Sequence, residues 1–156
     1  MMIKKGIILV IAIFFAIGTF AQTSTEVDLI QAAFGIEKMD IVNNFVKPTA
    51  DQKDAFLKVY NEYEVKRKEL GKTRIDLLNQ YAEQYEKMTN EQADTWMKGV
   101  MALSIKQDKL INSYYNKVKK VTDAKVATQF YQIEAYILTT IRYSVLETIP
   151  FVKEKK

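Results

Sequence analysis

The chain contains no cysteine and no histidine among its 156 residues. Enzymes most often use histidine as a general base and cysteine as a thiol nucleophile, and both residues are common ligands of soft metals. The sequence also lacks a glycine-rich phosphate loop. We therefore expect no catalytic residue, no metal site and no cofactor. Methionine sulfur can bind copper(I), and the predicted helices contain or border Met39, Met88, Met97 and Met101. Helical methionine more often fills a hydrophobic core, and we expect that role for these residues.

Proline and glycine are also scarce, with two prolines and five glycines in the chain. Both residues interrupt helices, and no segment alternates apolar and polar residues as a half-buried strand does. The sequence therefore predicts an all-α fold, stabilised by packing without disulfides. We expect four helices, at about residues 26–46, 51–87, 90–118 and 123–148, in an elongated antiparallel helical hairpin or bundle.

Threonine marks the start of two of these helices. Pro48 ends the preceding helix, because the residue before a proline avoids the helical conformation. Thr49 with Gln52, and Thr89 with Gln92, have the spacing of a capping box. In that motif the threonine oxygen accepts a backbone N–H, and the glutamine side chain bonds back to the backbone N–H of the threonine.

A third start is predicted at Thr122, where Lys125 stands in the place of the glutamine. Asp123 compensates there, because it puts negative charge at the positive end of the helix dipole. We therefore expect the fourth helix to be capped without a full capping box.

Each predicted helix carries an apolar stripe with a spacing of three and four residues, which indicates one face packed against other helices. In the second helix the stripe is interrupted by Lys66, Arg67 and Arg74, so we expect a wet, basic centre there. Glu64 and Lys68 have the spacing of a surface ion pair along that helix. The stripes comprise Leu29, Ile30, Ala33, Phe34, Ile41, Val42 and Phe45; Phe56, Val59, Tyr63, Leu70, Leu77, Tyr81 and Tyr85; Ala93, Met97, Val100, Ser104, Ile111, Tyr114 and Val118, widened by Trp96 and Leu103; and Val126, Phe130, Ile133, Ile137, Ile141 and Val145.

The N-terminus has the layout of a secretory signal. Lys4 and Lys5 precede an apolar run over residues 7–17, and small residues follow as far as Ala21. The run is shorter than the roughly 20 apolar residues of a membrane span, which favours cleavage over a permanent anchor. We therefore expect a cleaved signal peptide over residues 1–21, one helical domain over 22–152, a charged tail over 153–156 and no stable membrane insertion after cleavage.

The chain expected after cleavage is only weakly basic. It keeps 21 Lys and Arg against 19 Asp and Glu, so 21 minus 19 gives a net charge of +2. The basic residues are mixed with acidic ones, which is typical of solvated helix faces rather than of nucleic-acid binding.

Residues 88–92, Met-Thr-Asn-Glu-Gln, resemble the LTxxQ motif of the Spy/CpxP family of periplasmic helical proteins, with Met in the place of Leu. Residues 48–52, Pro-Thr-Ala-Asp-Gln, are similar to the other copy of this motif. Residues 121–134 and 149–152 resemble the C-terminal part of relatives of the Bacteroidetes type, so the similarity covers about residues 47–152. Neither copy has its Leu, and the missing histidine and cysteine argue against the metal-sensing branch of the family.

The resemblance implies a periplasmic envelope-stress protein, with a homodimer among the expected assemblies. Three roles stay open: an ATP-independent chaperone that binds unfolded envelope proteins, a non-enzymatic regulatory partner of an envelope sensor, and a structural helical protein at the membrane surface. Amphipathic side chains with a charged or polar tip suit weak contacts with unfolded chains. The candidate client-binding or partner-binding residues are Tyr63, Lys66, Arg67, Arg74, Tyr114 and Tyr115.

Overall fold

A computed structural model describes residues 37–152, and the predicted signal peptide, most of the first predicted helix and the C-terminal tail lie outside these residues. The described part contains four helices and no strand, which confirms the all-α prediction. They are α3 (Lys38–Phe45), α4 (Lys53–Gln84), α5 (Asn90–Val121) and α6 (Ala124–Thr148).

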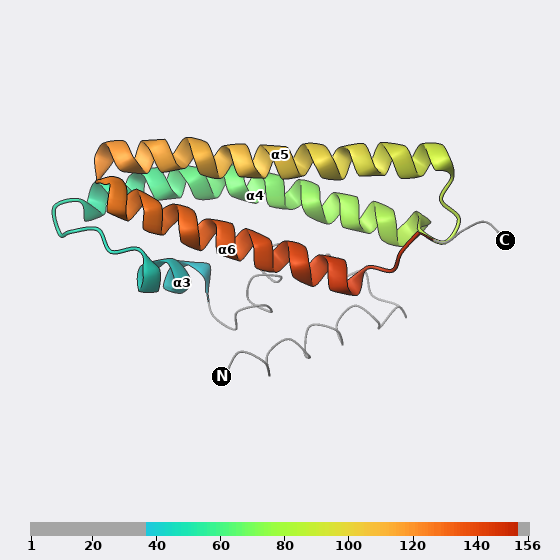
Figure 1. The fold of residues 1–156 in the computed structure, drawn as a ribbon, viewed down its shortest axis with the longest axis horizontal. Coiled ribbons are helices and arrows are strands. Elements are labelled where there is room, and N and C mark those ends of the chain that lie inside the picture. Colours follow the sequence, from blue (N-terminus) through green and yellow to red (C-terminus); the bar gives the residue numbers. More distant parts are fainter. Residues whose placement is uncertain (1–36, 153–156) are drawn as a thin grey trace.

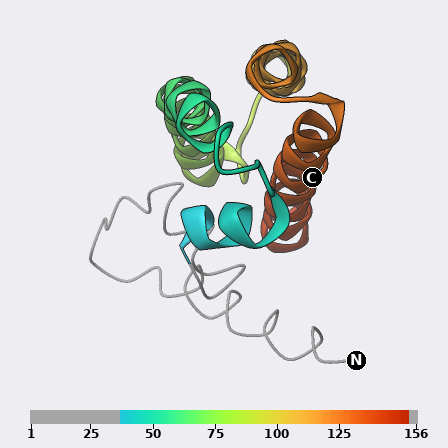
Figure 2. The same ribbon diagram turned by 90° about the vertical axis from the view of Figure 1, so that its left-hand side faces the viewer.

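The three long helices run antiparallel, one beside the next, in an elongated bundle (Figure 1). Viewed from its end, the bundle has α4, α5, α6 and α3 at four corners (Figure 2). The fourth corner holds α3, which is 8 residues long, whereas α4 and α5 have 32 residues each. We call the half of the bundle beside α3 the proximal half and the other half the distal half. No described helix occupies the fourth corner of the distal half (Figure 1).

The start of α5 has the predicted capping box. The Thr89 hydroxyl accepts the Gln92 backbone N–H at 3.2 Å, and the Gln92 side chain accepts the Thr89 N–H at 2.9 Å. At α4 only half of the motif forms, because the Gln52 side chain accepts the Thr49 N–H at 3.2 Å while the Gln52 N–H donates to the Thr49 carbonyl. The Thr49 hydroxyl bonds the Asp51 carboxylate instead and lowers the pKa of Asp51. The prediction of a threonine cap was therefore wrong at Thr49.

The start of α6 also differs from the prediction at Thr122. This threonine ends α5, where its hydroxyl donates to the Val118 carbonyl at 2.7 Å. Asp123 is the cap of α6 and accepts the backbone N–H groups of Lys125 and Val126 at 2.8 and 3.0 Å. The Val126 N–H, together with a hydrogen bond from the Gln52 side chain, lowers the pKa of Asp123.

Of the helix predicted over residues 26–46, the described part is helical from Lys38 to Phe45. Glu37 has an extended backbone, with a ψ of 141°, and α3 starts at Lys38. The predicted stripe is confirmed at Ile41 and Val42, which are buried, but it is wrong at Phe45, whose side chain is 60% exposed. The stripe residues from Leu29 to Phe34 lie outside the described residues.

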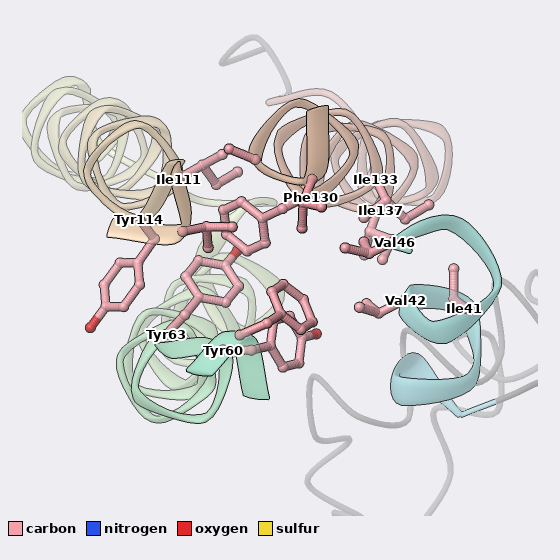
Figure 3. Packing of buried hydrophobic residues seen from close by; sticks show 14 of the residues in the cluster. Ile41, Val42, Val46, Tyr60, Tyr63, Ile111, Tyr114, Phe130, Ile133 and Ile137 are labelled. Carbon is pink, nitrogen blue, oxygen red and sulfur yellow. The ribbon is translucent and has the colours of Figure 1, made fainter. Parts of the chain in front are cut away.

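The main hydrophobic core fills the proximal half (Figure 3). Aromatic rings form its centre, where the Tyr63 ring meets the edges of Phe130 and Tyr114 at centroid distances of 5.2 and 5.4 Å. The α6 stripe contributes Phe130, Ile133 and Ile137 to the core, as its spacing predicted. Each of these large side chains contributes about 1.5–3 kcal/mol on burial, so the proximal half supplies much of the stability.

Candidate functional site

A network of charged and phenolic side chains lies inside the proximal half, where α3, α4 and α6 meet. The Lys38 ammonium of α3 donates to Glu134 Oε1 of α6 at 2.7 Å and to the Tyr60 hydroxyl of α4 at 2.9 Å. Glu134, which is 2% exposed, also accepts the Tyr60 hydroxyl at 3.1 Å and the Tyr63 hydroxyl at 2.7 Å. Lys38 further pairs with Glu64 of α4.

Arg67 completes this network by a two-point contact with Glu64, at 2.7 and 3.1 Å. Burial raises the pKa of Glu64, but the charges of Lys38 and Arg67 outweigh that effect, and the net pKa is lowered. Burial and the Glu134 charge raise the pKa values of Tyr60 and Tyr63 far above their ordinary range. Both phenols therefore remain protonated and donate to the carboxylate.

The network fixes α3 against the long helices. Its two cations and two carboxylates balance, which a buried cluster requires because an unpaired buried charge is strongly destabilising. The Lys38 ammonium also lies 5.2 Å from the centres of the Tyr60 and Tyr63 rings. The sequence prediction missed Lys38 and Glu134, and it paired Glu64 with Lys68, whereas Glu64 bonds Lys38 and Arg67.

The distal half contains a groove of about 320 Å³ between α4, α5 and α6. Its walls near the end of the bundle are apolar, whereas polar side chains lie at the inner end of the groove, toward the middle of the bundle. The apolar part comprises Leu77, Leu78, Trp96, Met97, Val100, Leu103, Val145, Leu146 and Ile149, and the polar part comprises Arg74, Ser104, Gln107 and Arg142.

Hydrogen bonds hold several of the groove residues in place. The Trp96 indole N–H donates to the Leu77 carbonyl at 2.9 Å, which joins α5 to α4. Arg142 of α6 donates to the Ser104 carbonyl at 3.2 Å and to the Asp108 carboxylate at 3.0 Å, which joins α6 to α5. The groove walls are thus supported on both sides of α5.

Exposed apolar side chains lie on α5 and α6, and two of them, Met97 and Leu146, also line the groove. Met97, Met101 and Ile105 are spaced four residues apart and share one side of α5, and they are 43%, 49% and 55% exposed. Leu146 of α6 lines the same groove as Met97 and is 70% exposed. We call these four residues the apolar rim. The prediction that helical methionines fill the core was wrong at Met97 and Met101, and also at Met39 of α3, which is 36% exposed.

The residues predicted to bind clients do not form one exposed surface. Three of them are buried, namely Tyr63 and Tyr114 in the core and Arg74, at 7% exposure, in the wall of the groove. Burial of Arg74 contradicts the predicted wet centre of the second helix. Arg67 is half-buried against Glu64.

The two other predicted residues remain at the surface. Lys66 is exposed, and its ammonium lies 5.9 Å from the centre of the Tyr114 ring. Tyr115 is half-buried and meets the edge of the Tyr131 ring at 6.2 Å. Lys66 and Tyr114 thus come together, while Tyr115 points to α6.

The apolar rim could have been recognised from only one signal in the sequence, the regular spacing of Met97, Met101 and Ile105.

Among residues 37–152, no group of three or more carboxylates forms a metal site. None of the four described helices is sufficiently long and apolar to span a bilayer.

Comparison of the chain with protein-family models, with curated proteins and with solved structures finds no match. The resemblance to the LTxxQ motif at residues 48–52 and 88–92 therefore stays a prediction.

Proposed function

We propose that the protein is a non-enzymatic, ATP-independent binding protein of the cell envelope that holds apolar segments of unfolded proteins on the apolar rim. The observation that carries the proposal is the exposure of Met97, Met101, Ile105 and Leu146 on adjoining helices. Contiguous exposed apolar patches on soluble proteins often mark a site of contact with a partner. The predicted signal peptide and the LTxxQ resemblance support a location in the periplasm.

The rim suits weak and reversible contacts. Two of its four residues are methionines, whose flexible side chains adapt to different partner shapes. Partial burial of a rim side chain contributes roughly 1 kcal/mol. Four such contacts sum to roughly 4 kcal/mol, near the lower estimate of the cost of association, so binding is weak and each encounter with a client is short.

The proposal is tested by the aggregation of a chemically reduced or heat-unfolded model protein, with and without the purified chain that begins at residue 22, and without ATP. We expect suppression near equimolar ratio. Replacing Met97, Met101 and Leu146 by serine should weaken the suppression severalfold, because the exposed apolar surface of the rim is reduced.

A matched control replaces three other exposed apolar residues by serine in the same way. These are Phe45 on α3, Val65 in the first half of α4 and Val121 at the C-terminal end of α5. Suppression by this control should equal that of the wild type. Absence of suppression by a helical, folded wild-type protein refutes the proposal. Capture of one envelope sensor would then favour a regulatory role, and binding to liposomes a role at the membrane surface.

A further inference from the structure

The groove is concave, whereas the apolar rim is an exposed surface. A concave site of this kind suits one small molecule. Its volume of about 320 Å³ falls at the lower end of the range of ligand pockets, which are mostly apolar with a few converging polar groups. Its walls come from three helices that hydrogen bonds hold together at Trp96 and Arg142.

Polar and apolar residues are segregated along the groove. On each helix, the polar lining residue lies nearer the middle of the bundle than the apolar ones: Arg74 precedes Leu77 and Leu78 on α4, and Arg142 precedes Val145 and Ile149 on α6. Helix α5 runs the other way, and there Ser104 and Gln107 follow Trp96 and Val100. The groove thus has a polar inner end and an apolar outer end, the pattern that an elongated amphiphile requires.

The charged side chains that line the inner end are both cationic, and the Asp108 carboxylate that bonds Arg142 lies outside the lining. Arg74 and Arg142 line the groove, and none of the described residues that line it is acidic. Arg142 is paired with the exposed Asp108 through Nη2, and a guanidinium has five N–H donors in all. An anion at the inner end can therefore bond Arg142 without displacing Asp108. Because the walls are apolar, the attraction between an anion and these guanidinium groups is screened less than in water.

The volume indicates the class of ligand. At the lower end of the range of ligand pockets, it suits one alkyl chain of medium length better than two. We propose that the groove binds a single-chain anionic amphiphile of the fatty-acid type, with its carboxylate near Arg74 and Arg142 and its chain along Leu78, Val100 and Val145. The groove shares Met97 and Leu146 with the apolar rim, whereas the residues that would hold the amphiphile are less exposed than these two.

The chain contains a single tryptophan, and Trp96 lies in the apolar part of the groove. Its fluorescence therefore reports binding directly. Titration of the folded chain with monomeric decanoate should give a saturable change with one site per chain, whereas decanol should bind about tenfold more weakly, because it lacks the charge-assisted bond. Vesicles of anionic phospholipid should leave the fluorescence unchanged, because a phospholipid has two long chains and the groove lies at the lower end of the range of ligand pockets.

Brominated decanoates test the orientation without any mutation. A bromine on the terminal carbon should quench Trp96 more strongly than one on the carbon beside the carboxylate, because the outer end of the groove holds the tail. Val100→Phe, which fills the groove, should abolish binding, and Arg142→Gln should weaken it about tenfold. The matched controls Val65→Phe and Lys66→Gln, both at exposed positions of α4, should bind as the wild type does.

Equal affinity for decanoate and decanol, equal quenching by the two bromides, or no saturable change in the folded wild type would each overturn the inference. These outcomes leave the aggregation assay unaffected, so failure of the groove and failure of the rim are distinguishable.

Discussion

Replacing Glu134 with glutamine removes one negative charge from the centre of the bundle and keeps the shape of the side chain. Glu134 accepts three hydrogen bonds, from Lys38, Tyr60 and Tyr63. A hydrogen bond to a charged group contributes about 1 kcal/mol more than a neutral one, so the change should cost about 3 kcal/mol. Breaking a buried ion pair costs about 3–5 kcal/mol, in agreement with that sum.

The assay is urea unfolding followed by circular dichroism, in a double-mutant cycle with Lys38→Met. Each single variant leaves charge in the core without its partner, whereas the double variant removes both charges of the pair. We therefore expect the double variant to be more stable than the sum of the single effects predicts, by about 1–2 kcal/mol.

The matched control is the ion pair between Asp94 and Lys98, whose side chains are 62% and 69% exposed. The cycle of Asp94→Asn with Lys98→Met should give a coupling below about 0.5 kcal/mol, because water screens the pair. A loss of less than about 1 kcal/mol for Glu134→Gln, or additive effects in the core cycle, would refute the argument that the network fixes α3.

Two further predictions concern the helix ends and the acid stability. Thr89→Ala should destabilise the protein by about 1 kcal/mol in urea unfolding, and Thr49→Ala by clearly less, because only Thr89 caps a helix with its hydroxyl; equal losses would contradict the two cap geometries. The pKa of Glu64 is lowered from 4.5, so its stabilising contribution is complete above that value and is lost as the pH falls through the lower folded pKa. The stability difference between the wild type and Glu64→Gln should therefore shrink as the pH falls below 4.5, and a constant difference would show that Glu64 is not charged in the fold.

The long helices could be predicted from the sequence because local signals and packing agree there. In α6 the predicted residues Val126, Phe130, Ile133, Ile137 and Ile141 are all buried. The stripe has a spacing of three and four residues, and the helix faces three neighbours, so its apolar side must be buried whatever their order.

The buried charges could not be predicted in the same way. Lys38 and Glu134 are 96 residues apart in the sequence, and each is unremarkable among charged residues until α3 lies against α6. The burial of Arg74 could not be predicted for the same reason, because only the packing of three helices places this residue in the groove wall. The spacing of residues along a helix shows which side of the helix a residue lies on. It does not show whether a residue of opposite charge lies opposite it in the folded protein.

The apolar rim was missed for a related reason. Met97 belongs to an apolar stripe, and that pattern predicts burial, yet the side chain is 43% exposed. Burial of a helix face requires a neighbouring element at that position, and the spacing of apolar residues along α5 does not show where such a neighbour is missing.

The most direct test of the proposed function is site-specific photocrosslinking to an unfolded client. The chain has no cysteine, so a single photoreactive label can be attached at Met101→Cys in the rim or at Asn61→Cys on the exposed side of α4. We predict crosslinks from position 101 to the unfolded client and not to its native form, with few from position 61. Equal crosslinking from both positions, or none from position 101 in a protein that suppresses aggregation, would contradict the assignment of client binding to the rim.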